Sequence, residues 1–157
     1  LSELLRTSLY RRDVVQIPLR DELTLINDYL ELERMRFEER LQVEINVDES
    51  LLSAPVLPLS IQVLVENAIK HGIAQRKDGG VIRIGVAKYG ADLLISVSNP
   101  GYLSAGPANG LGLRNLRERL QLQYNGAAVF RLKELPEGIV CAQIKLPLHA
   151  SISNPDH

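Results

Sequence analysis

The sequence predicts an α/β (α+β) fold of two layers, with helices on one face of a mixed, largely antiparallel sheet. Apolar residues at helical spacing alternate along the chain with segments in which apolar and polar residues alternate. The last predicted strands follow one another through short turns, which is typical of antiparallel pairing. A chain of 157 residues with this pattern is long enough for one domain around one core.

Composition and charge narrow the function classes. The chain is 45% hydrophobic and 24% charged, as ordinary soluble domains are, and its formal net charge is -1. This charge gives no electrostatic reason to expect nucleic-acid binding. The single cysteine, Cys141, lies in an alternating apolar run, which fits a buried thiol in a reducing cytoplasm. No run approaches the roughly 20 apolar residues of a membrane-spanning helix, so we expect a cytoplasmic location.

Three segments are expected along the chain. Residues 1–18 are predicted to be the end of an upstream helical segment and its linker, because leucines follow helical spacing from the first residue. Residues 19–148 would form the domain, and residues 149–157 a disordered tail. Within the domain we expect a helix from Pro18 to Phe37, a strand at 41–47, a helix from Leu59 to His71 ended by Gly72, strands at 81–88 and 93–97, a loop at 99–112, a helix at 113–124, and strands at 129–132 and 139–146.

The segment 65–72 carries the strongest functional signal. On a helix, Glu66 lies one turn from Lys70, and Asn67 lies one turn from His71, so four polar side chains form two adjacent columns. An amide on an otherwise apolar helix suits coordination of a hard cation, and Lys70 could neutralise phosphate. The alternative is a solvated helix face with a Glu66–Lys70 ion pair, which is the commoner case for a helix taken in isolation.

A second signal follows a predicted strand. Asn99-Pro100-Gly101 precedes a flexible loop, and Gly110-Leu111-Gly112-Leu113 then opens a helix. Glycines at a helix start let the backbone approach a phosphate, although a plain loop is the commoner explanation when nothing else supports this. A dinucleotide fingerprint fails because Asn115 stands where its third glycine belongs, and no P-loop or zinc-ligand spacing is present.

Taken together and in this order, the segments 66–72, 99–101 and 110–115 resemble the N, G1 and G2 boxes of the GHKL ATPases. Flanking segments at 22–37 and 116–124 resemble the LytS/YehU-type sensor histidine kinases, so the resemblance covers nearly the whole chain. It implies a Bergerat-type sheet with a flexible ATP lid. It also implies a catalytic domain that uses ATP and Mg²⁺ to phosphorylate a histidine on an upstream domain.

The resemblance implies roles for individual positions. Asn67 would ligate Mg²⁺, Glu66 would act as a base or polarise the accepting group, and Lys70 and His71 would face the phosphates. Asn99 would accept a hydrogen bond from the adenine amino group. The remaining implied nucleotide contacts are Gly101 at the base, Gly110, Gly112 and Leu113 at the foot of the lid, and Asn115 near phosphate. Glu33 and Arg36 are expected to form a structural ion pair rather than a catalytic one.

The sequence departs from the family pattern at three points. Asn99 replaces the usual Asp of the G1 box, and Leu103 replaces its second Gly. None of the three histidines, His71, His149 and His157, stands in the family's phosphoacceptor context. We therefore expect the chain not to label itself with γ-labelled ATP.

Partners are implied by the same resemblance. They are an upstream dimerisation and phosphoacceptor domain of the same protein and a response regulator. The parent would be a homodimeric, membrane-linked kinase with this domain in the cytoplasm. One alternative function is a nucleotide-sensing GHKL module that binds ATP without phosphotransfer, and another is an ATP hydrolase or serine kinase of a different GHKL branch.

Overall fold

The computed structural model describes residues 15–103 and 110–148 of the chain. Most of the expected upstream segment, the central part of the expected lid and the expected disordered tail lie outside these ranges. Within the described ranges, no helix is both long and apolar enough to cross a membrane.

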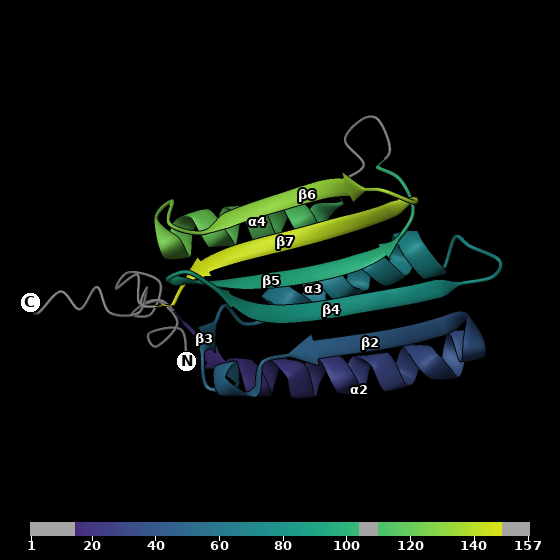
Figure 1. The fold of residues 1–157 in the computed structure, drawn as a ribbon, viewed down its shortest axis with the longest axis horizontal. Coiled ribbons are helices and arrows are strands. Elements are labelled where there is room, and N and C mark those ends of the chain that lie inside the picture. The colour runs from purple at the N-terminus through teal and green to yellow at the C-terminus, as the bar shows by residue number, and fades with distance from the viewer. Residues whose placement is uncertain (1–14, 104–109, 149–157) are drawn as a thin grey trace, which may run out of the picture.

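A five-stranded sheet forms one layer of the domain, and three helices form the other (Figure 1). The strand order is β2-β4-β5-β7-β6. Strands β2 and β4 run parallel, and the remaining neighbouring pairs all run antiparallel. The predicted two-layer fold with a mixed, largely antiparallel sheet is confirmed. The main elements are α2 (Leu19–Phe37), β2 (Leu41–Val47), α3 (Ser60–Ala68), η3 (Ile69–Ile73), β4 (Gly80–Tyr89), β5 (Asp92–Pro100), α4 (Leu111–Tyr124), β6 (Val129–Leu135) and β7 (Ile139–Pro147).

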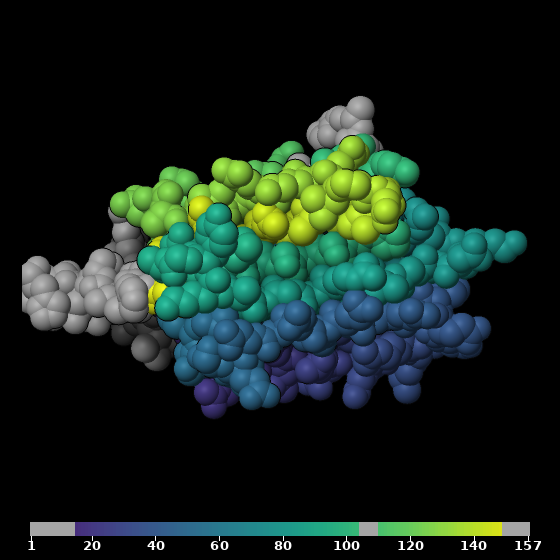
Figure 2. All heavy atoms as spheres, viewed as in Figure 1, coloured from purple at the N-terminus to yellow at the C-terminus, as the bar shows by residue number. Residues whose placement is uncertain are grey.

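The core lies between the sheet and the helices. Every second residue of β5 is buried, from Leu93 to Asn99, and its register with β7 places Leu93, Ile95 and Val97 opposite Leu146, Ile144 and Ala142. No helix of the described residues covers the other face of these strands, which is the surface seen in Figure 2. Strand alternation in the sequence therefore separates one buried face from one open face.

The N-terminal elements enclose the core from one side. Pro18 is the N-cap of α2, as its fixed φ suits, and Ile26, Leu30 and Phe37 of this helix are buried. Four short elements were not expected from the sequence. They are β1 (Ile17–Pro18) and β3 (Pro55–Val56), which pair with each other, and the 3-10 turns η1 (Glu38–Arg40) and η2 (Glu49–Leu51).

The helix after residue 59 differs from the prediction at its C-terminal end. Gly72 was expected to stop it, but α3 runs directly into η3, a π-helical turn that continues through Gly72 to Ile73. A π-turn inserts an extra residue and commonly occurs at functional sites. Gly72 therefore does not terminate the helix, and its role lies in the candidate site instead.

The lone cysteine, Cys141, is only 5% exposed, as the sequence predicted. Burial raises the pKa of its thiol, and the positive charge of Lys133 only partly opposes this. The thiol is therefore a weak nucleophile.

Candidate functional site

A pocket of about 160 Å³ lies where α3 and η3 meet the ends of β5 and β7 and the first turn of α4. Its walls combine polar groups that can bind a ligand with apolar surface that can cover a flat ring. The lining residues are Asn67, His71, Gln75, Asn99, Gly101, Tyr102, Leu103, Leu113, Leu132 and Val140.

Half of the residues singled out in the sequence meet in this pocket. They come from all three motifs and are Asn67, His71, Asn99, Gly101 and Leu113. The other five do not line it. Glu66, Lys70, Gly110, Gly112 and Asn115 are exposed side chains or backbone positions beside the pocket.

Asn67 of α3 and His71 of η3 both line the pocket, because they lie about one turn apart on the same side of the continuous α3–η3 segment. The opposite side of α3 is apolar, and Ile61, Leu64 and Ala68 are buried against the core. Asn67 itself is half-buried at the pocket wall.

Glu66 lies on the side of α3 that faces α2. Its Oε1 accepts a hydrogen bond from Gln62 Nε2 at 3.2 Å. Burial and the negative charges of Glu33 and Glu66 raise the pKa of Tyr29 on α2 to about 12. The Glu66–Lys70 ion pair of the alternative interpretation, a solvated helix face, is absent from the ion pairs between described residues.

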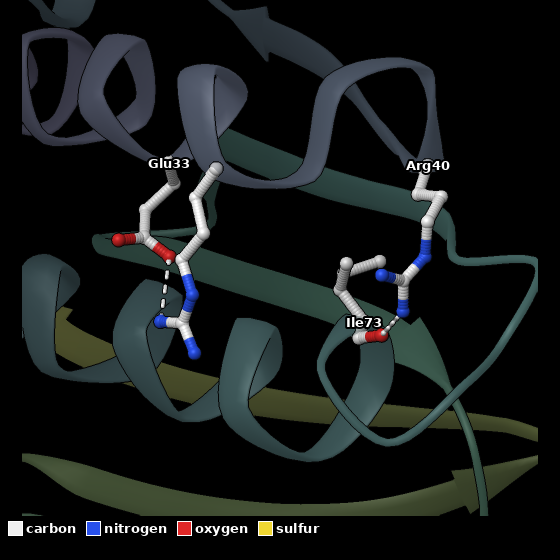
Figure 3. A network of polar contacts seen from close by, with 4 residues as sticks. Glu33, Arg40 and Ile73 are labelled. Atoms are coloured by element: carbon white, nitrogen blue, oxygen red, sulfur yellow. Dashed lines mark hydrogen bonds and ion pairs between the residues drawn. The ribbon is translucent and has the colours of Figure 1, made fainter.

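The expected pair of Glu33 and Arg36 is present on α2. Arg36 Nη1 lies 3.7 Å from Glu33 Oε2. The dashed line at Glu33 in Figure 3 marks this ion pair. Arg36 also lies over the Phe37 ring, 4.7 Å from its centroid. These contacts belong to the helix surface and not to the pocket, which supports a structural role for the pair.

Gly72 allows η3 to touch Asn99. A Cβ built on Gly72 would lie 2.5 Å from Asn99 Cβ and 2.7 Å from Asn99 Nδ2. Both distances are far shorter than van der Waals contact, so only glycine permits this approach. The N-box helix and the end of β5 are thereby brought together directly.

Asn99 is only 6% exposed, and its amide has a defined orientation. Its Nδ2 donates a 2.8 Å hydrogen bond to the carbonyl oxygen of Pro100, which leaves the side-chain oxygen as the acceptor. Next along the chain, Gly101 adopts φ 143° and donates its N–H to Gly138 O at 2.7 Å. The end of β5 is therefore rigidly held beside the pocket.

Burial and the nearby charge of Lys70 both lower the pKa of His71 below its ordinary value of 6.5. The imidazole is therefore neutral at neutral pH in the free protein. An anion entering the pocket would reverse this preference, because it stabilises the imidazolium form.

Sequence patterns did not identify Gln75, Tyr102, Leu132 and Val140 as pocket residues. Val140 reaches the pocket because the register of β5 and β7 places it opposite Asn99. Leu132 reaches it through the register of β6 and β7. Strand pairing between distant segments leaves no local sequence signal. Tyr102 was within reach of sequence analysis, since it directly follows the G1 segment.

The donor chemistry of the pocket fits a cation that is shared with a phosphorylated ligand. Among the described residues, no group of three or more His, Cys, Asp or Glu side chains could hold a metal by itself. Asn67 supplies one amide oxygen at the wall. A Mg²⁺ ion commonly takes one or two protein ligands and completes its octahedron with phosphate oxygens and water.

Comparison with known proteins identifies the family of the chain. A family model described as histidine kinase matches residues 1–41. Sensor histidine kinase YpdA of Escherichia coli (strain K12) is 36% identical, over 85% of this chain and 26% of its own length. Sensor protein LytS of Enterococcus faecalis is 30% identical, over 94% of this chain and 28% of its own length. The chain thus spans about a quarter of the length of these relatives.

Among solved structures, the catalytic domain of histidine kinase ThkA superimposes with a TM-score of 0.66 at 19% identity. The match covers 85% of this chain and 94% of that domain. The fold is therefore that of a histidine kinase catalytic domain. Within that class, the sequence relatives place the protein more narrowly: the chain belongs to the LytS-type sensor histidine kinases.

Proposed function

We propose that the chain binds ATP with Mg²⁺ in the pocket between α3, β5 and α4 and transfers the γ-phosphoryl group to a histidine on an upstream domain. The convergence of Asn67, His71 and Asn99 from separate elements on one pocket carries this proposal. In the parent protein, a dimeric and membrane-linked kinase, the phosphoryl group would pass on to a response regulator.

Each wall of the pocket supports a different part of the nucleotide. The Asn99 oxygen is free to accept a hydrogen bond from the adenine amino group, since Nδ2 is already bonded to Pro100. Apolar Leu113 and Val140 offer surface for the base. Asn67 and His71 would lie at the phosphate end, with the exposed Lys70 beside them.

Positioning and charge neutralisation would supply most of the catalysis, as in other phosphoryl transfers. Bound Mg²⁺ would neutralise charge on the phosphate oxygens. The half-buried Asn67 would orient it, and His71 would stabilise the phosphates in its protonated form.

A phosphotransfer assay tests this function. The chain is incubated with γ-labelled ATP and Mg²⁺, alone and joined to the upstream helical segment of the parent protein. We expect acid-labile phosphohistidine only when the upstream segment is present, and less of it with Asn67→Ala. Stable label on His149 or His157 of the chain alone would contradict the proposed division of roles.

The position of Glu66 favours a second candidate, a module that binds ATP and changes conformation without phosphotransfer. Glu66 faces Gln62 and α2 instead of the pocket, so a role as base is not built into this arrangement. Nucleotide binding together with no phosphohistidine in the assay above would select this second candidate.

A further inference from the structure

The N-box segment, defined as α3 followed by η3 (residues 60–73), contains the N box at 66–72 and has no side-chain cap of its own. Its N-cap residue, Leu59, adopts a left-handed conformation with φ 65° and contributes no side-chain hydrogen bond. Helix ends leave backbone N–H groups and carbonyl oxygens without intrahelical partners, so these groups need acceptors and donors from elsewhere. Both ends of this segment obtain them from α2 or from the turn that follows it.

At the N-terminal end, the partner is Glu22 of α2. Its Oε1 accepts a hydrogen bond from Leu59 N at 2.8 Å, and its Oε2 accepts from Ile61 N at 3.0 Å and Gln62 N at 3.2 Å. The Glu22 side chain has no exposed surface. A buried carboxylate is costly unless it is fully hydrogen-bonded, and a helix N-terminus attracts negative charge.

At the C-terminal end, the partner is Arg40 of η1. Its Nη2 donates hydrogen bonds to Ile73 O at 3.3 Å and to Arg76 O at 2.7 Å, and Figure 3 shows the first of these. The guanidinium also lies 5.5 Å from the centroid of the Phe37 ring. A helix C-terminus attracts positive charge, so Arg40 has the sign that this end requires.

We propose that Glu22 and Arg40 are positioning residues that together form a two-ended clamp on the N-box segment. Apolar packing holds α3 against the sheet, and the polar contacts at both ends add constraints on its place along its own axis. Asn67 and His71 belong to the clamped segment, while Asn99 belongs to β5 and is held by the sheet. The clamp therefore sets the position of the Mg²⁺ and phosphate side of the pocket relative to its adenine side.

This inference rests on the proposed function, and calorimetry separates the two. The 157-residue chain is titrated with ADP in Mg²⁺ and again in EDTA, as wild type, Glu22→Gln and Arg40→Gln. Glu44→Gln and Arg20→Gln are matched controls, since both residues are exposed and neither contacts α3. We expect both clamp variants to lose about tenfold in Mg²⁺–ADP affinity, the equivalent of about one hydrogen bond to a charged group, and to change less than about twofold in EDTA.

A purely structural role would lower the affinity equally in Mg²⁺ and EDTA, and that result would overturn the clamp. Unchanged Mg²⁺–ADP affinity in both variants would overturn it too. If Glu22→Gln does not fold, Arg40→Gln at the more exposed end decides by the same two criteria.

Hydrogen exchange tests the clamp without any nucleotide, so it decides even if the wild-type chain binds no ADP and the proposed function fails. In Glu22→Gln we expect faster amide exchange from the first turn of α3 through Asn67 to His71. Faster exchange confined to residues 59–62 would show a local cap only and would overturn the proposal.

Discussion

Two regions of the candidate site are held in different ways. The strand wall, Asn99 and Gly101 at the end of β5, is buried or half-buried and fixed by hydrogen bonds to Pro100 and Gly138. The lid wall, defined here as Gly110, Gly112 and Asn115 at the start of α4, is exposed and does not line the pocket. A Cβ on Gly110 would meet nothing within 4 Å. The motifs of both walls looked equally informative in the sequence, yet packing defines only the strand wall in this structure.

The largest expected effect is at Asn99 on the strand wall. Asn99→Leu removes the acceptor for the adenine amino group and should cost about 1–3 kcal/mol, or roughly ten- to a hundredfold in ATP affinity. Discrimination against GTP should fall with it, because guanine presents a carbonyl at that position.

Asn99→Asp should keep or strengthen binding, since an ionised acceptor makes the stronger hydrogen bond. Ser98→Ala, on the opposite face of β5, is the control. If Asn99→Leu binds ATP as well as the native chain, Asn99 is not the adenine contact.

The next effect concerns Gly72, which makes the strand wall possible. Gly72→Ala forces a backbone-anchored Cβ against Asn99, which should cost about 1–3 kcal/mol of stability, as overpacked cores do. Displacement of Asn99 should also weaken ATP binding by about tenfold, or 1.4 kcal/mol. Denaturant unfolding and calorimetry measure the two costs. Native stability and affinity in Gly72→Ala would mean that η3 and β5 are not in tight contact.

A smaller effect is expected from His71. The pKa of His71 lies below 6.5 in the free protein, so the imidazole is uncharged at pH 7.5. Phosphate beside it would raise that pKa, so binding takes up a proton and ATP affinity increases as the pH falls from about 7.5 to 6. Calorimetry in two buffers of different ionisation enthalpy measures the uptake. His71→Gln should abolish it, and equal uptake in this variant would assign the proton to another group.

Folding stability depends on pH in the opposite direction from ATP affinity: the His71 contribution to stability decreases as the pH falls. Folding lowers the His71 pKa, so the unfolded chain binds its proton more readily. The neutral imidazole contributes fully to the free energy of unfolding at pH values above the pKa of His71 in the unfolded chain. This contribution is lost as the pH falls through the pKa of His71 in the folded chain.

The smallest effect is expected on the lid wall. A Cβ on Gly112 would lie 3.6 Å from Val63 Cγ1, an ordinary contact. Gly112→Ala should therefore change ATP affinity by less than about twofold and leave stability within about 0.5 kcal/mol, as ordinary surface substitutions do. A tenfold loss of affinity would show that the start of α4 closes on the nucleotide, and the contrast between the walls would then hold only for the free protein.

Local patterns predicted most of the fold because they report directly on burial. Leu93, Ile95 and Val97 recur at every second position and lie on the buried face of β5. Pro18 starts α2 as predicted. Some elements are longer than predicted. Strand β4, for example, extends one residue beyond the predicted 81–88 at each end, because backbone pairing continues to the exposed Tyr89, opposite Asp92.

The candidate site was less predictable because much of it depends on contacts between distant segments. Spacing along α3 correctly placed Asn67 and His71 together. The contribution of Val140 requires knowledge of the β5–β7 register. The roles of Gly72 and Glu22 depend on neighbours 27 and about 37–40 residues away in the chain, so helix rules predicted only a helix stop at Gly72 and did not single out Glu22.

Titration calorimetry of the unmutated chain with ATP, in Mg²⁺ and in EDTA, tests the central claim most directly. Asn67 offers an oxygen to the cation at the wall that also holds His71, so we predict tighter binding in Mg²⁺. Asn67→Ala should bind equally in both conditions. Equal affinity in Mg²⁺ and EDTA for the unmutated chain, or no binding in either, would contradict a Mg²⁺-assisted ATP site in this pocket.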